Sequence, residues 1–110
     1  MVQPTDIKAA YERLETARES LFQAEEARIE AAQNRETKFM EAVNEAAADG
    51  IADPGRQQQK ALKATRDELT ALHSAEKASR RAQHEYAVVG IRVDSLNKQL
   101  EAEKLAAGVD

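Results

Sequence analysis

Few side chains in this chain of 110 residues could do metal chemistry. His73 and His84 are its only histidines, and it contains no cysteine. A zinc or iron site on helices needs three or four ligands at helical spacing, as in HExxH or a pair of ExxH motifs. The sequence contains neither motif. We therefore interpret both histidines as surface residues and expect neither a metal nor another cofactor.

Residues for acid–base or nucleophilic catalysis are not arranged as a site either. The carboxylate pairs, such as Glu25-Glu26 and Asp67-Glu68, are sequence neighbours, and adjacent residues on a helix point in different directions. Glycine-rich phosphate loops and nucleophile elbows are missing from the sequence. Arg28 and Arg35 fall near the predicted helix contact, but no second cluster of cations matches them. We therefore expect a protein that is not an enzyme.

A basic segment is the main candidate for contact with nucleic acid. Residues 56–84 contain 7 Lys and Arg against 3 Asp and Glu, and some of these cations share one helical stripe, as phosphate-tracking side chains do. However, the net charge of the chain is −4. Pairing with residues 5–49, which contain 6 basic and 11 acidic residues, explains the same cations. Nucleic-acid contact is therefore our alternative, through Arg56, Lys60, Lys63, Arg80 and Arg81.

The elements that must position these residues are helices. One third of the chain is charged, and it contains 4 Gly, 2 Pro and no Trp, which is typical of long helices. We predict one helix from about residue 5 to 48, capped by Thr5, and a turn over 49–54. In the turn, Gly50 suits the left-handed position after a helix end, and Asp53-Pro54 suits a helix start. A second helix is predicted from about 54 to 107.

The spacing of apolar residues predicts how the two helices pack. Apolar residues and alanines recur every three or four positions in both helices, as in coiled coils. A short turn makes the helices antiparallel, so residues whose numbers add up to about 103 become neighbours. Leu14 then faces Val89, and Ala17 faces Tyr86. The predicted fold class is all-α, with residues 1–110 as a single domain that forms an antiparallel coiled-coil hairpin.

Several apolar residues lie one position off this predicted contact. They either widen the core, because helices often have three apolar positions per heptad, or contact another chain. Gly90 lies among them and would allow a close approach or a kink. Ordering a residue costs roughly 1.5 kcal/mol, so we doubt that a lone hairpin is very stable and expect a homodimer, with a four-helix bundle as one form. The predicted partner interface is Phe22, Ile29, Val88 and Ile91, together with the neighbouring Tyr86 from the helix contact.

These features predict a non-enzymatic protein–protein interaction module that serves as a scaffold, adaptor or assembly factor. Small proteins rich in Ala, Glu and Arg are common among the accessory and virion proteins of phages and other mobile elements. The sequence contains no apolar run of the roughly 18 residues that span a bilayer, and residues 1–10 lack the apolar segment of a secretion signal. We therefore expect a cytoplasmic protein without membrane contact, or a virion component if a phage encodes it.

Overall fold

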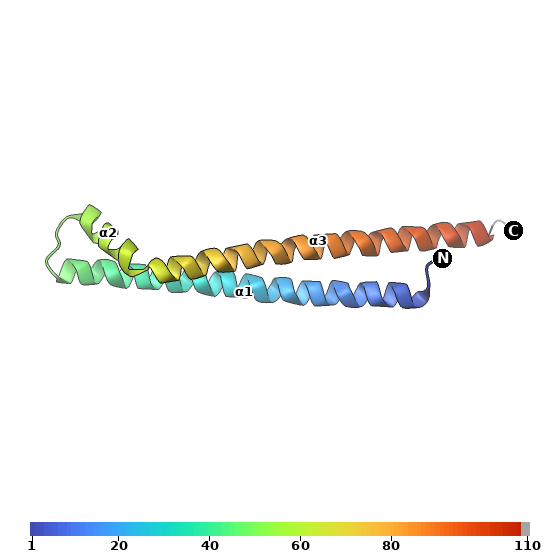
Figure 1. Ribbon diagram of the computed structural model, residues 1–110, viewed down its shortest axis with the longest axis horizontal. Coiled ribbons are helices and arrows are strands. Elements are labelled where there is room, and N and C mark those ends of the chain that lie inside the picture. Colours follow the sequence, from blue (N-terminus) through green and yellow to red (C-terminus); the bar gives the residue numbers. More distant parts are fainter. Residues whose placement is uncertain (109–110) are drawn as a thin grey trace. The chain divides into compact units, whose positions relative to one another are not determined.

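The computed structural model describes residues 1–108, and the secondary structure of this part is entirely helical (Figure 1). The helices are α1 (Pro4–Ala48), α2 (Pro54–Ala64) and α3 (Arg66–Gly108). The predicted all-α class is thus confirmed. Residues 109–110, the last two of the predicted domain, lie outside the described residues.

Helix α1 begins at Pro4, one residue before the predicted start. Proline is favoured in the first helical position because its missing N–H would have no partner there. The Asp6 carboxylate accepts a hydrogen bond from the backbone N–H of Gln3 at 2.9 Å. The predicted cap at Thr5 is wrong, because Thr5 lies inside the helix; the Asp6 carboxylate instead bonds back to the residue before the helix.

The segment between α1 and α2 has the backbone conformation that its residues favour. Gly50 has a φ of +91°, a left-handed value that glycine adopts at little cost. The N–H groups of Gly50 and Ile51 donate to the carbonyl oxygens of Ala47 and Ala46, both at 3.1 Å, and so satisfy the end of α1. Asp53 then caps α2, because its side chain accepts a hydrogen bond from the N–H of Gly55.

The prediction of one continuous helix from about 54 to 107 is wrong, because the chain leaves helical geometry at Thr65. Thr65 has φ −110° and ψ 23°. Its hydroxyl donates to the carbonyl oxygen of Ala61 at 2.7 Å, and its own N–H donates to the same oxygen at 3.0 Å. Such a bond from a threonine hydroxyl to the carbonyl four residues earlier bends helices. Thr65 is buried, so this bond is shielded from water.

Contacts divide the chain into two units. Unit 1 combines residues 1–23 with the chain from Arg80 onward, and unit 2 is Ala24–Ser79. In unit 1 the segments of α1 and α3 run antiparallel, because Val2 donates to the Glu103 carboxylate at 2.9 Å and Asn97 donates to the Tyr11 hydroxyl at 2.9 Å. Figure 1 shows these two segments side by side.

Unit 2 contains the rest of α1, all of α2 and the start of α3. Near the turn, Lys60 forms an ion pair with Asp49 at 3.4 Å. At the other end of the unit, the hydroxyl of the buried Ser79 donates to the Glu25 carboxylate. Lys60 thus contacts the late residue Asp49 of α1, and the later residue Ser79 contacts the earlier residue Glu25. The chain segments in unit 2 therefore also run antiparallel.

The core of each unit consists mainly of small side chains. The buried residues are Val2, Ala10, Ala17 and Val93 in unit 1, and Ala46, Ala61, Thr65 and Ser79 in unit 2. Small side chains let helices approach closely, but they bury little apolar area, and burial stabilises by about 25 cal/mol per Å². The larger apolar residues are half-buried or exposed instead.

Candidate interaction surface

Four of the five residues of the predicted partner interface are exposed. Val88 and Ile91 retain 47% and 70% of their accessible surface, and Phe22 and Ile29 retain 58% and 47%. Tyr86 is half-buried. Phe22, Tyr86, Val88 and Ile91 belong to unit 1, whereas Ile29 belongs to unit 2.

The helical geometry of α3 explains why Tyr86 differs from Val88 and Ile91. Successive residues are about 100° apart, so Tyr86 lies only about 20° around the helix from the buried Val93. Val88 and Ile91 lie about 140° and 160° from it. These two side chains therefore point away from α1, and they do not widen the core between α1 and α3.

Gly90 lies on α3 between these two residues, and the helix continues through it without a break. A Cβ atom added there would have no atom of residues 1–108 within 4 Å, apart from its own helical backbone and chain neighbours. The close approach that we considered for Gly90 therefore does not occur within this part of the chain.

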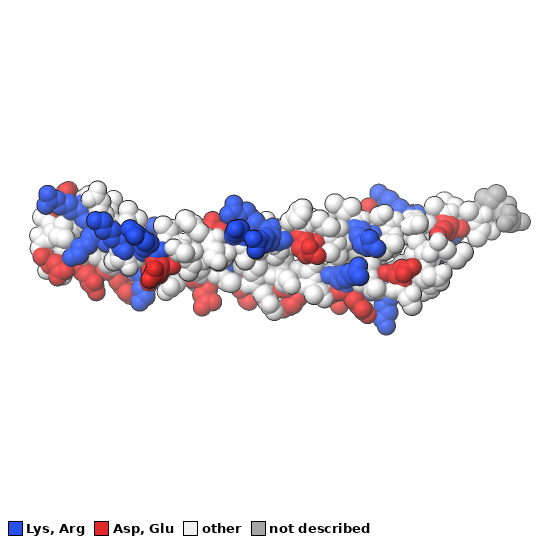
Figure 2. Space-filling view, in the orientation of Figure 1, with Lys and Arg blue, Asp and Glu red and all other residues white. Residues whose placement is uncertain are grey.

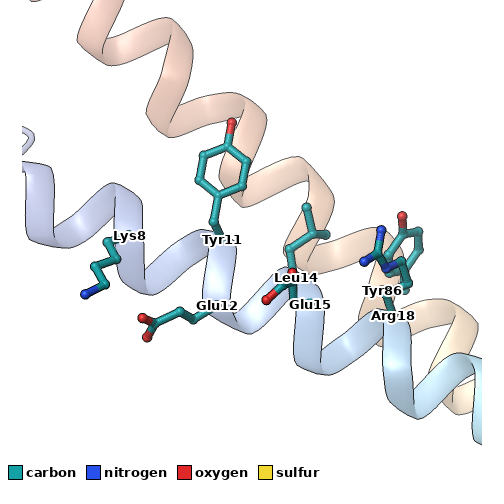
Figure 3. A pocket seen from close by; sticks show the side chains of 7 residues that line it. All are labelled: Lys8, Tyr11, Glu12, Leu14, Glu15, Arg18 and Tyr86. Carbon is teal, nitrogen blue, oxygen red and sulfur yellow. The ribbon is translucent and has the colours of Figure 1, made fainter.

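A groove that the sequence did not reveal opens beside α1 in unit 1. It has a volume of about 550 Å³. Figure 3 shows Tyr11 and Leu14 directed toward α3, and Arg18 next to the ring of Tyr86. Lys8, Glu12 and Glu15 complete the lining. Two aromatic rings with an arginine can bind the side chains of a partner, because Tyr and Arg often dominate binding energy at interfaces.

The cations proposed for nucleic-acid contact fall into two groups. Arg56, Lys60 and Lys63 lie on α2 in unit 2, and Arg80 and Arg81 lie on α3 in unit 1. Figure 2 shows Lys and Arg side chains over α2 and the start of α3, and Asp and Glu side chains along the neighbouring part of α1. One of these cations, Lys60, is paired with Asp49.

Unit 2 also contains a polar cluster that spacing alone did not predict. Glu25 accepts from Ser79 on α3 and forms an ion pair with Arg28 at 3.0 Å on its own helix. Farther along α1, the guanidinium of Arg35 lies 5.2 Å from the ring centre of Phe39. The Nε atom of Arg35 and one carboxylate oxygen of Glu68 are buried without a hydrogen-bond partner. Polar groups thus interrupt the apolar contact of this unit, and we assign no ligand to them.

Within residues 1–108, His, Asp and Glu side chains nowhere gather in the groups of three or more that could hold a metal ion. None of the helices in this part combines the length and the apolar character that a membrane span requires. Comparison of the chain with protein-family models, with curated proteins and with solved structures finds no significant match. The function of the predicted partner interface and of the groove is therefore inferred from the positions and exposure of their side chains.

Proposed function

We propose that this chain is a non-enzymatic protein–protein interaction module, an antiparallel coiled-coil hairpin that acts as a scaffold, adaptor or assembly factor. In this proposal it works in the cytoplasm, or in a virion if a phage encodes it. The observation that supports the proposal most is the exposure of Val88 and Ile91 on the side of α3 that points away from α1.

Two further properties of these residues favour binding. Full burial of a Val or Ile side chain stabilises by about 1.5–3 kcal/mol, and most of that free energy is still available at Ile91 because 70% of its surface is exposed. Side chains that branch at Cβ also have little rotamer freedom to lose when a partner covers them. The groove of Tyr11, Arg18 and Tyr86 adds binding side chains to the same unit.

Substitution of Ile91 tests the proposal. Ile91→Lys places a charge on the proposed contact while keeping a good helix former, so we expect normal helicity but loss of association. Leu105→Lys is the matched control, because Leu105 is 72% exposed on the same helix. The measurements are sedimentation equilibrium and copurification with binding proteins from the native source. If Ile91→Lys and Leu105→Lys behave alike in both, the proposed contact surface is wrong.

The second candidate function, contact with nucleic acid, is favoured by the composition of α2. Its 11 residues include Arg56, Lys60 and Lys63 and no acidic residue. We expect a double variant, Lys60→Glu with Lys63→Glu, to leave protein association unchanged under the first proposal. Under the second, it abolishes DNA binding, and the wild-type affinity falls steeply with added salt. Fluorescence anisotropy with a labelled duplex measures both effects.

A further inference from the structure

Unit 1 presents an acidic side on α1 that has one large exposed apolar residue. Glu12, Glu15 and Phe22 lie about 140–160° around α1 from the buried Ala17, so they point away from α3. All three side chains are exposed. Among the described residues, neither glutamate forms an ion pair. The same side also carries Glu19 and one cation, the exposed Lys8. Its net charge is therefore negative, and neither Glu12 nor Glu15 has an ion-pair partner within the described chain.

The opposite side of unit 1, on α3, is basic. Arg80 and Arg81 lie about 120–140° around α3 from the buried Val93, close to the directions of Val88 and Ile91. Both arginines are exposed, and neither forms an ion pair with a residue in the described part of the chain. The two outer sides of unit 1 thus have opposite charges, and each also has exposed apolar side chains.

The charged and apolar residues are spaced alike on the two sides. On α1, Glu12 and Glu15 precede Phe22 by ten and seven residues. On α3, Arg81 precedes Ile91 and Val88 by the same ten and seven residues. A segment of α1 laid parallel to α3 therefore places Phe22 between Val88 and Ile91 while both glutamates lie beside the arginine pair.

An antiparallel alignment fits less well. It would bring Phe22 to Val88 and Ile91 but set the glutamates beside residues 92–104, which have no net charge: Arg92, Lys98 and Lys104 against Asp94, Glu101 and Glu103. Of these cations, Lys98 is already paired with Asp94 at 3.1 Å. The parallel alignment sets the glutamates beside two arginines instead, so it is favoured. Glu19, on the same side of α1, has no cation opposite it in the parallel alignment.

We propose that a second copy of this chain covers these sides, with the outer side of α1 in one copy packed parallel against the outer side of α3 in the next. This inference rests on the proposed interaction function and names the partner. The contact joins different copies, because within one chain α1 and α3 already face each other with their other sides. The contact is heterologous, because two different surfaces meet. After each copy is added, the outer side of α1 in one end copy and the outer side of α3 in the other end copy remain uncovered. The assembly therefore extends with concentration or closes into a ring.

Charge reversal on each side tests this arrangement. One double variant is Glu12→Arg with Glu15→Arg, and the other is Arg80→Glu with Arg81→Glu. Each variant alone brings like charges together, so we expect the monomer mass at concentrations where the wild type associates. An equimolar mixture restores association, because the reversed α1 of one variant then meets the reversed α3 of the other. Sedimentation velocity at low ionic strength, where ion pairs are least screened, measures these masses.

The matched control is Glu41→Arg with Glu45→Arg, which makes the same charge change at exposed positions of α1 in unit 2, beyond the part of α1 that the parallel alignment lays against the described part of α3. It should keep the wild-type association, and circular dichroism should show the wild-type helicity in all variants. If a variant unfolds, Phe22→Lys takes its place, and it should also give a monomer.

Three results would overturn the inference: a wild type that stays monomeric, a Glu12 and Glu15 variant with wild-type mass, or a mixture that fails to associate. The Ile91→Lys test separates these failures from failure of the proposed function. In one outcome, Ile91→Lys no longer copurifies with a protein other than this chain. In another, Ile91→Lys becomes monomeric while the glutamate variant still associates. Either result means that the surface of Ile91 binds a partner, but that the partner is not the acidic side of α1. If Ile91→Lys changes neither measurement, the proposed function fails as well.

Discussion

Replacement of Gly90 by alanine should raise the stability of the chain and leave its association unchanged. Gly90 lies in the interior of α3, where glycine costs about 0.5–1 kcal/mol relative to alanine. An added Cβ has no atom of the described chain within 4 Å, apart from the local helix backbone and chain neighbours, so nothing offsets that gain. For a chain of this size, the gain corresponds to a rise in Tm of about 2–8 °C.

Association should not change, because Gly90 lies only about 60° around α3 from the buried Val93, whereas Val88 and Ile91 lie about 140° and 160° from it. The new methyl group is therefore off the side of α3 that the proposed partner covers. Thermal unfolding followed by circular dichroism measures the first effect, at a concentration where the protein is monomeric. Sedimentation velocity measures the second. Ala87→Gly, at an exposed position on the same helix, is the control and should lower Tm by a similar amount.

Two results would refute this reasoning. A fall in Tm for Gly90→Ala would mean that another part of the chain approaches Gly90 closely. Weaker association of Gly90→Ala would mean that a partner packs against the side of α3 that carries Gly90, and not only against the side of Val88 and Ile91.

Three further substitutions test the fold. Gly50→Ala should lower stability by about 1–2 kcal/mol, because Gly50 has a left-handed φ of +91°; urea unfolding with an unchanged midpoint would contradict this. Thr65→Val should lower the free energy of unfolding by about 0.5–1.5 kcal/mol, because the hydrogen bond to Ala61 is lost. This loss should exceed that of Thr70→Val, because the similar bond of Thr70 is exposed to water. Ser79→Ala should cost about 1.5 kcal/mol, since its buried hydroxyl donates to a carboxylate, and an unchanged Tm would exclude that role.

The helical class and the helix ends near the turn could be predicted from the sequence because they depend on local chemistry. Glycine at a left-handed position and Asp-Pro at a helix start act through their own backbone and their nearest neighbours. Gly50 and Asp53 accordingly have the backbone conformations expected of a helix end and a helix cap. The single-domain interpretation of residues 1–110 stays a prediction.

The break at Thr65 could not be predicted because it depends on which hydrogen bond the threonine hydroxyl forms once the residue is buried. Threonine is tolerated inside helices, and Thr70 makes the same type of bond within α3 without ending the helix. The start of α1 is a similar case: Thr5 was predicted as the cap, whereas the structure places it inside the helix and bonds the Asp6 carboxylate to the N–H of Gln3.

The candidate surface was predicted only as a set of residues. Val88 and Ile91 stood one position off the predicted helix contact, where an apolar side chain fits either a wide core or a partner. Only the orientation of α3 shows that both point away from α1. The groove beside Tyr11 and Tyr86 could not be predicted, because it depends on which residues of two distant segments become neighbours.

The most direct test of the central claim, that a protein covers Val88 and Ile91, is the reactivity of a thiol at position 91. The chain has no cysteine of its own, so Ile91→Cys introduces a single reactive group, and Ser20→Cys provides an exposed control in the same unit, away from both outer sides. We predict that maleimide labels Cys at position 91 rapidly in dilute monomer and much more slowly in the assembled or partner-bound protein, with position 20 labelled equally fast in both. Equal labelling of position 91 in both states would contradict the claim.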